Sequence, residues 1–207
     1  MPSLDRWTDV WQRLGAASAD RGTFERLMAC YAKPQRHYHT LRHLDECLDQ
    51  LDALRGAAVR PAEVELALWF HDAVYDTRRH DNEARSVQWA RDAMHAARVQ
   101  DAVAQRVHDL IMVTRHDAQP HDLDAKVMVD VDLSILGAIT ERFDEYERQI
   151  RAEYAWVPGV VFRATRRKLL QGFLARPSIF NTAPFVAAYE GRARANLQRA
   201  LERLERR

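Results

Sequence analysis

The sequence predicts an all-helical protein, and two observations support this. The 207 residues include only 7 glycines and 7 prolines, which leaves few of the turn residues that a many-stranded protein needs. Apolar residues recur every three or four positions along most of the chain, which is the spacing of one helix face. Because no repeat, low-complexity tract or flexible linker interrupts the pattern, we expect a single domain over residues 1–207.

Six helices are expected in the first half of the chain, over 4–14, 24–31, 41–54, 61–74, 82–97 and 101–114. Thr40 is a plausible N-cap for the third helix, and Gly56 would close it. Pro61 suits the first turn of the fourth helix. The body of that helix, 64–74, is apolar nearly all round, so we expect it to be buried on most sides.

The second half is less uniform. Segment 115–126 is polar and contains Pro120, so we expect a loop, while the mixed apolar and acidic segment 127–136 has no periodicity that assigns it. Three more helices are expected, over 143–154, 162–173 and 184–204. The β-branched run 157–161 is too short and interrupted to predict a strand.

The charge balance excludes some classes of protein. Lys and Arg total 31 and Asp and Glu total 30, so the formal net charge is +1, which argues against a dedicated nucleic-acid binder. No apolar run approaches the roughly 18–20 residues of a membrane span, and the first residues lack the apolar core of a signal peptide. Cys30 and Cys47 are interpreted as small core residues in a reducing compartment. We therefore expect a cytoplasmic protein without a membrane partner.

Histidine followed directly by aspartate occurs five times, at 71–72, 80–81, 108–109, 116–117 and 121–122. Four of these doublets lie in polar segments, where surface charge is the simplest interpretation. His71-Asp72 differs because it lies in the most apolar predicted helix. A buried carboxylate beside a buried imidazole costs several kcal/mol unless a hydrogen-bond network or a cation offsets the cost. From these two residues alone, a hydrogen-bonded core network and a metal site are both possible interpretations.

Other possible ligands favour the metal site. His39 and His43 are four residues apart and could share a helix face, although Thr40 as N-cap would leave His39 just outside the helix. Asp130 and Asp132 again place carboxylates among apolar residues. Imidazole and carboxylate ligands together suit Mn, Fe, Zn or Co and, less readily, Mg.

The order of His43, His71-Asp72 and Asp132 resembles the HD superfamily of metal-dependent phosphohydrolases, in particular a bacterial group of predicted members of about this length. Further motifs that resemble this group lie at 36–43, 67–75, 81–86, 132–137, 150–154 and 192–197. The similarity extends from about residue 7 to residue 197. It implies an all-α HD core over about 36–137, with additional N-terminal helices and C-terminal helices over about 140–207 packed on it.

The resemblance implies that His43, His71, Asp72 and Asp132 hold a divalent metal ion. Asp130 competes for the last place, and we prefer Asp132 because the run Asp-Leu-Ser-Ile-Leu-Gly begins there. Two-metal members of the superfamily use two extra histidines. His116 could be one of them, but the position near 82–83 has no histidine here. One ion is therefore expected, with Mn, Fe, Co, Zn and Mg all open as its identity.

The implied activity is hydrolysis of a phosphate ester of a nucleotide or similar small phosphorylated metabolite, through a metal-activated water. Whether the enzyme is a monoesterase or a diesterase stays open. Asp72 would orient or deprotonate the water, and His39 or His116 would protonate the leaving oxygen. The residues expected to face or clamp the substrate are Arg36, Glu83, Arg115 and Lys126.

One alternative is a non-catalytic HD-fold module that binds a nucleotide or a partner protein. It would keep the helices without needing all four ligands, which favours the enzyme. A nucleic-acid binder that uses the basic last helix ranks below both, since the positive surplus of that helix is small. A homo-oligomer is compatible with each of these readings.

Overall fold

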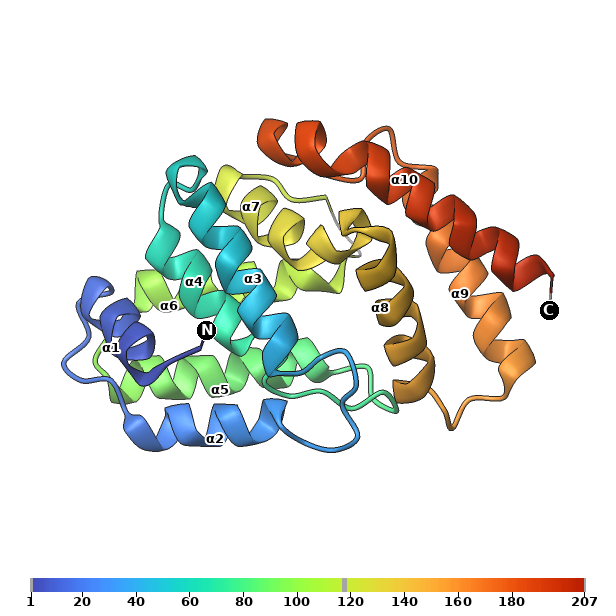
Figure 1. The fold of residues 1–207 in the computed structure, drawn as a ribbon. Helices are drawn as coiled ribbons and strands as arrows, with labels where there is room; N and C mark the ends of the chain where they lie inside the picture. The colour runs from blue at the N-terminus through green and yellow to red at the C-terminus, as the bar shows by residue number, and fades with distance from the viewer. Residues whose placement is uncertain (1, 117–118, 207) are drawn as a thin grey trace. The chain divides into compact units, whose positions relative to one another are not determined.

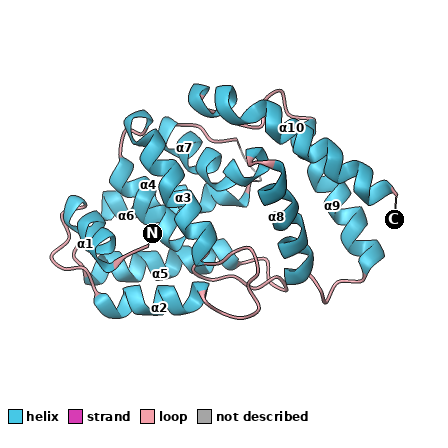
Figure 2. Ribbon diagram, viewed as in Figure 1, coloured by secondary structure: helices cyan, strands magenta, loops and turns pink. Residues whose placement is uncertain are grey.

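A computed structural model describes residues 2–116 and 119–206, and within them every regular element is a helix (Figures 1 and 2). The α-helices are α1 (Leu4–Arg13), α2 (Arg21–Tyr31), α3 (Leu41–Leu54), α4 (Pro61–Phe70), α5 (Asn82–Ala96), α6 (Asp101–Met112), α7 (Leu123–Asp132), α8 (Thr140–Glu153), α9 (Gly159–Leu174) and α10 (Ala183–Glu205). Short 3-10 helices are η1 (Arg55–Ala57), η2 (Val113–Arg115) and η3 (Leu133–Gly137). The prediction of an all-helical fold is confirmed.

The chain divides into two compact units, Met1–Val131 and Asp132–Arg207. The first unit contains α1 to α6 and all of α7 except its last residue. The second contains η3 and α8 to α10. The division falls inside the final turn of α7, so Asp132 is carried by a helix whose other residues belong to the first unit.

Helix α4 is the centre of the first unit. Its residues from Glu63 to Phe70 are all buried, and it packs against α1, α3, α5 and α6, which lie around it in Figure 1. The ring of Trp69 meets those of Trp7 on α1 and Phe24 on α2 edge-on, at centroid distances of 5.4 and 6.1 Å, an arrangement that aromatic pairs favour. The expectation that this segment is buried nearly all round is confirmed.

Two buried glutamates on α4 are matched by arginines from neighbouring elements. Glu65, which is fully buried, accepts hydrogen bonds from Arg6 (2.8 Å), Arg13 (2.7 Å) and Arg55 (3.1 Å). Glu63 accepts two bonds from Arg106 on α6, at 2.7 and 2.6 Å. A buried carboxylate without such partners would be strongly destabilising. These ion pairs therefore tie α1, η1 and α6 to α4.

The start of α7 corrects the sequence prediction. Residues 123–126 were expected in a loop, but α7 begins at Leu123. Asp122 accepts a hydrogen bond from the backbone N–H of Ala125 at 2.8 Å, which is the bond of a helix N-cap. Asp124 accepts bonds from the N–H groups of Val59 and Arg60, just before α4. The polar residues that suggested a loop thus cap α7 and hold the backbone just before α4.

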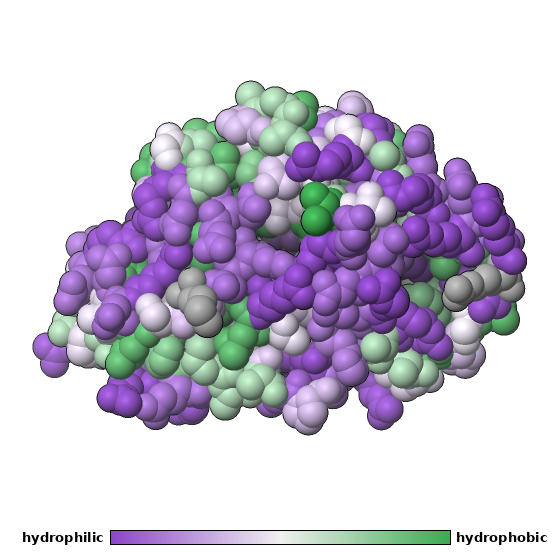
Figure 3. Space-filling view, viewed as in Figure 1, coloured by the Kyte–Doolittle hydropathy of each residue, from purple (hydrophilic) through white to green (hydrophobic). Residues whose placement is uncertain are grey.

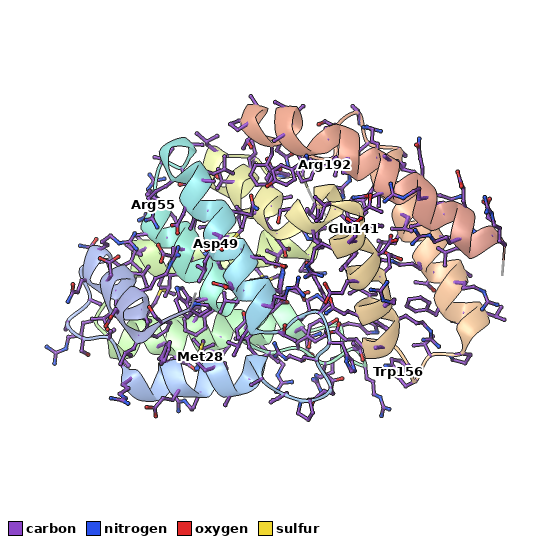
Figure 4. The ribbon with its side chains drawn as sticks, viewed as in Figure 1. Met28, Asp49, Arg55, Glu141, Trp156 and Arg192 are labelled. Carbon is purple, nitrogen blue, oxygen red and sulfur yellow. The ribbon has the colours of Figure 1, made fainter. Side chains whose placement is uncertain are left out.

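In the second unit, α10 packs on η3. The buried side-chain amide of Asn196 donates hydrogen bonds to the carbonyls of Leu136 (2.8 Å) and Ala138 (2.9 Å). Arg192, labelled on α10 in Figure 4, donates to the carbonyl of Gly137 at 2.8 Å. A Cβ on Gly137 would lie 2.6 Å from the Cβ of Tyr189 and 2.9 Å from its carbonyl oxygen. The contact between η3 and α10 therefore requires a glycine at position 137.

The surface carries few large apolar side chains. The face drawn in Figure 3 is mainly hydrophilic, with apolar residues in small groups. Exposed apolar residues include Trp156, labelled in Figure 4 between α8 and α9, and Val160 and Val161 in the first turn of α9. Among the described helices, none combines the length and apolar character that crossing a membrane requires.

Replacing Gly137 with alanine is expected to lower the free energy of unfolding by about 1–3 kcal/mol, because the added methyl group overlaps Tyr189. The matched control is Gly191→Ala, since Gly191 lies inside α10 and a Cβ there meets no atom within 4 Å. That control should leave stability unchanged or raise it by up to about 1 kcal/mol. Urea unfolding of both variants measures the difference. Equal stabilities for the two variants would contradict the close packing of η3 on α10.

Asp20 is expected to stabilise α2 in a pH-dependent way. Its carboxylate accepts hydrogen bonds from the Thr23 hydroxyl (2.6 Å) and the Thr23 N–H (2.7 Å), and these bonds lower the pKa of Asp20. Asp20→Ala should therefore cost about 1 kcal/mol at neutral pH. Because the pKa is lower in the folded state, this difference is complete above the unfolded value of about 3.9 and shrinks as the pH falls through the folded value.

Urea unfolding of wild type and Asp20→Ala at pH 7 and pH 3 measures the effect. Asp49→Ala is the control, because Asp49 is exposed in the middle of α3 (Figure 4). A loss that is the same at both pH values would show that the Asp20 carboxylate does not act as the cap.

Candidate metal centre

The His71-Asp72 doublet lies at the C-terminal end of α4. It was expected inside a helix over 64–74, but α4 ends at Phe70 and His71 is its C-cap. Nδ1 of His71 lies 2.8 Å from the carbonyl oxygen of Leu68. Because a carbonyl only accepts, Nδ1 carries a proton and donates it to this bond, which leaves Nε2 as the nitrogen that faces the cluster. This hydrogen bond orients Nε2 of His71 as a potential metal ligand.

His43 brings a second imidazole to the same point. Thr40 is the N-cap residue of α3, as predicted, although its side chain makes no capping hydrogen bond. His43 lies in the first turn of α3, and both His43 and His71 are 2 % exposed. Their Nε2 atoms are 3.2 Å apart. Two buried ring nitrogens that face each other at this distance suit joint coordination of a cation.

Two carboxylates lie at the histidine pair. An oxygen of Asp72 is 3.1 Å from Nε2 of His71 and 3.4 Å from Nε2 of His43. Asp132, at the end of α7, belongs to a group with His43, His71 and Cys47 in which one ligand atom of each residue lies within 4.8 Å of the others. This group contains Asp132, the preferred candidate, and neither Asp130 nor Asp72. Asp72 is close to the two histidines alone. A mixed set of nitrogen, oxygen and sulfur donors fits a divalent transition metal or zinc.

Sequence reasoning missed Cys47 in this group. It was interpreted as a small core residue, and it is indeed buried, at 1 % exposed. The spacing of four residues after His43 could have identified it, because positions i and i+4 share a helix face. That face of α3 points at His71 of α4, which the sequence alone does not show.

Asp72 is held in its ionised form. Burial alone would raise its pKa, but the neighbouring imidazoles of His71 and His39 and hydrogen bonds with His43 and His71 outweigh that effect and hold the pKa well below the usual range. Its side chain is 17 % exposed, so it lies at the edge of the buried cluster. Asp72 therefore offers a negative charge at neutral pH.

Arg36 holds the backbone at the end of the doublet and that of His39. It is buried at 4 % exposed, and its guanidinium donates hydrogen bonds to the carbonyls of Asp72 (2.7 Å), Ala73 (3.0 Å) and His39 (3.2 Å). It also lies over the ring of Tyr75 at 5.6 Å. These contacts show a positioning role, while the expected clamping of phosphate by Arg36 stays a prediction.

His39, expected as a general acid, lies next to the centre. Its ring stacks on Tyr75 at a centroid distance of 4.0 Å and lies 5.7 Å from the ring of His43. Its position just before the N-cap of α3 keeps it outside the helix, as expected. Ser86 of α5 accepts a hydrogen bond from the Val74 N–H at 3.0 Å and so fixes the chain that leads from the doublet to Tyr75.

The other predicted residues lie on neighbouring elements. Glu83 is in the first turn of α5 and Lys126 is in α7, and neither makes a hydrogen bond or ion pair with a described ligand. Arg115 ends η2, and His116 follows it with a left-handed backbone (φ 56°). Their roles toward substrate stay predictions.

Among the described residues, the other doublets are less buried than His71-Asp72. His80 and His121 are exposed, and His108 is partly exposed. The doublet at 116–117 includes Asp117, which lies outside the described residues. His71-Asp72, which the sequence analysis selected for its apolar neighbours, is therefore the buried doublet among those described.

Comparison of the chain with models of protein families, with curated proteins and with solved structures finds no match. The case for a metal centre therefore rests on its geometry. Two oriented imidazole nitrogens, a thiol and carboxylates converge at the ends of α4 and α7 and at the start of α3. These donors fit a divalent ion.

His71→Ala is expected to abolish metal binding, because it removes a central nitrogen of the cluster. The protein purified with added zinc or cobalt should carry roughly one ion per chain, and the variant should carry almost none by elemental analysis. His80→Ala is the matched control, since it changes the histidine of an exposed doublet. Full metal content in His71→Ala would contradict this assignment. Asp72→Ala is expected to lose the metal as well.

Proposed function

We propose that this protein is a metal-dependent phosphohydrolase of the HD type, which hydrolyses a phosphate ester of a nucleotide or similar small phosphorylated metabolite. The observation that supports it is the buried pair of His43 and His71 with Asp72 at the edge of the cluster. The order of these residues and of Asp132 is the order that the resemblance to the HD superfamily implies.

The proposed reaction needs a hydrolytic water and charge stabilisation at the phosphoryl group. A divalent ion held at this centre supplies both, since it acts as a Lewis acid and lowers the pKa of a bound water. His43 and His71 would hold the ion through Nε2, with Asp72 and Asp132 as the carboxylate ligands. The hydrogen bond from His71 to Leu68 keeps the ligand nitrogen in the required tautomer.

Asp72 is the residue that we assign to the water. Its carboxylate is ionised at neutral pH, because its pKa is held well below the usual range, and it lies within 3.4 Å of both histidines. An ionised carboxylate accepts a hydrogen bond and thereby fixes the direction of a water molecule. Because a carboxylate with a low pKa is a weak base, Asp72 is better suited to orient the water molecule than to accept and keep its proton.

The leaving oxygen needs a proton, and His39 is the better placed of the two candidates. Its ring is held by Tyr75 at 4.0 Å on the side of His43. A protonated imidazole can donate its proton to a leaving oxygen and so act as a general acid. His116 is the second candidate. Arg115, Lys126 and Glu83 are proposed to contact the substrate, and Arg36 to hold the loop that carries Asp72.

The charge of the chain favours a small substrate. A net charge of +1 gives no extended positive track for a polymer. A nucleotide or phosphorylated metabolite needs only a few cationic groups beside the metal. We therefore propose a small phosphorylated molecule, and not a nucleic acid, as the substrate.

A second candidate function has one observation in its favour. The group of His43, Cys47, His71 and Asp132 offers four potential protein ligands, and structural zinc sites are closed by four protein ligands. A closed centre would make the protein a non-catalytic module that binds a nucleotide or a partner protein. A measurement of phosphate-ester hydrolysis distinguishes this candidate from the enzyme.

The metal-loaded protein is expected to release phosphate from at least one member of a panel of nucleotides, cyclic nucleotides and small phosphomonoesters. A chelator should abolish turnover, and Mn or Co should restore it. Asp72→Asn should lower kcat by about 100-fold or more, because it removes the charge that orients the water. A colorimetric phosphate assay with added Mn, Mg, Co and Zn measures this.

The control is Asp81→Asn, which changes the aspartate of an exposed doublet that pairs with Arg79. It should keep full activity. If the folded, metal-loaded wild type released no phosphate across the panel, the binding module would replace the enzyme as the preferred function.

A further inference from the structure

A cavity of about 220 Å³ lies between α1, α2 and α5 of the first unit, the three helices labelled in the lower part of Figure 1. Its lining contains none of the candidate metal ligands. Pockets for drug-sized ligands measure about 300–1,000 Å³, so this cavity has room for a smaller molecule. There is space beside α5 because that helix contributes the small side chains of Ala93 and Ala96 to the lining.

Two indole rings belong to the lining of this cavity. Trp11 of α1 is 2 % exposed, and its N–H has no hydrogen-bond partner in the described part of the chain. Trp89 of α5 is partly exposed. Because buried polar groups almost always have a partner, the unpaired N–H of Trp11 indicates a missing hydrogen-bond acceptor, which a bound molecule would supply.

Hydrogen bonds hold the loop between α1 and α2, which contributes Ser18 and Asp20 to the lining. The N–H of Ala17 donates to the carbonyl of Ala97 at 2.9 Å. Asp20 accepts bonds from the N–H and the hydroxyl of Thr23, at 2.7 and 2.6 Å. The fold therefore sets the shape of this side of the cavity.

The three charged residues of the lining do not balance one another. Arg26 donates to the hydroxyl of Thr23 at 2.9 Å, and that hydroxyl donates to Asp20, so Arg26 and Asp20 belong to one bonded group. Asp92 accepts a bond from the neutral amide of Gln88 at 2.8 Å and forms no ion pair with a described Lys or Arg. The lining thus has one carboxylate, Asp92, without an opposite charge.

We propose that this cavity is a second binding site of the protein and that it takes a small organic ammonium ion. Asp92 lies three residues after Trp89, so the two side chains share one side of α5. The face of an indole attracts cations, and the guanidinium of Arg26 already lies 6.0 Å from the ring centre of Trp89, at the outer limit of such a contact.

Other classes of ligand fit this lining less well. An anion would meet the carboxylates of Asp20 and Asp92. A Mg²⁺ or Ca²⁺ ion needs six or more oxygen ligands, and one free carboxylate does not provide them. An ammonium ion with an apolar body satisfies both the negative charge and the indole walls.

Choline is the probe for this site, because it combines an ammonium group with a hydroxyl oxygen that can accept a bond from Trp11. It is titrated into the full-length, isotope-labelled protein, and the indole N–H signals of the five tryptophans are followed by nuclear magnetic resonance. The signals of Trp11 and Trp89, assigned with Trp→Phe variants, should move with a dissociation constant of about 1 mM, a scale that suits so small a ligand. The neutral analogue, in which carbon replaces the nitrogen, should bind about threefold more weakly or worse.

Two charge variants test how the site selects its ligand. Asp92→Asn should weaken choline binding about threefold, while Asp49→Asn, which changes an exposed aspartate of α3, should not affect it. Arg26→Gln should strengthen binding about threefold, because it removes a positive charge from the lining. Damage to the fold would not produce this gain.

A third variant tests the location. Ala93→Leu places a larger side chain one turn after Trp89 and should abolish the movement of the signals. Ala84→Leu is the matched control, because Ala84 is an exposed residue of the same helix that does not line the cavity. Circular dichroism should show wild-type helix content for both variants.

The outcomes decide the proposal independently of metal binding and of phosphate release. If neither signal moved in the folded wild type at high millimolar choline, the site would be overturned. Equal affinity for the neutral analogue would overturn the assignment of a cation. Wild-type affinity in Ala93→Leu would show that choline binds elsewhere and would overturn the role of this cavity.

Discussion

The complete burial of α4 is the constraint on which the first unit depends. A helix buried from Glu63 to Phe70 needs neighbours on all sides, and α1, α3, α5 and α6 provide them. Burial also requires each charged group on α4 to find a partner, because an unpaired buried charge is strongly destabilising. The arginines that meet Glu65 and Glu63 satisfy this requirement and join elements far apart in sequence.

The same constraint explains where the candidate metal centre lies. The C-terminal end of a helix leaves carbonyl groups without partners inside the helix and carries a partial negative charge. His71 and Arg36 engage carbonyls at the end of α4, and a cation beside them is electrostatically favoured. Asp124 joins the beginning of α7 to the residues just before α4. Helices α4 and α7 are each ten residues long. His71 directly follows α4, and Asp132 is the last residue of α7.

The second unit depends on a different kind of contact. Helix α10 comes so close to η3 that Gly137 has no room for a side chain, and Asn196 bonds to the carbonyls on either side of that glycine. At this contact close packing and buried hydrogen bonds hold the elements together, while ion pairs of Arg166 with Glu147 and of Arg203 with Asp144 join α9 and α10 to α8. The motif of residues 132–137 thus has a structural role that is independent of any ligand role of Asp132.

The sequence by itself determined the helical class, the burial of residues 64–70 and the choice of His71-Asp72 among five doublets. It could do so because helical periodicity and apolar context are local properties. It predicted a loop over 123–126 wrongly, because capping residues look like loop residues until their hydrogen bonds are known. Only the tertiary structure showed that the face of α3 with His43 and Cys47 meets His71, and that Arg36 bonds to the backbone of the doublet. Those contacts depend on which face of α3 packs toward the end of α4, and no spacing within one segment encodes that.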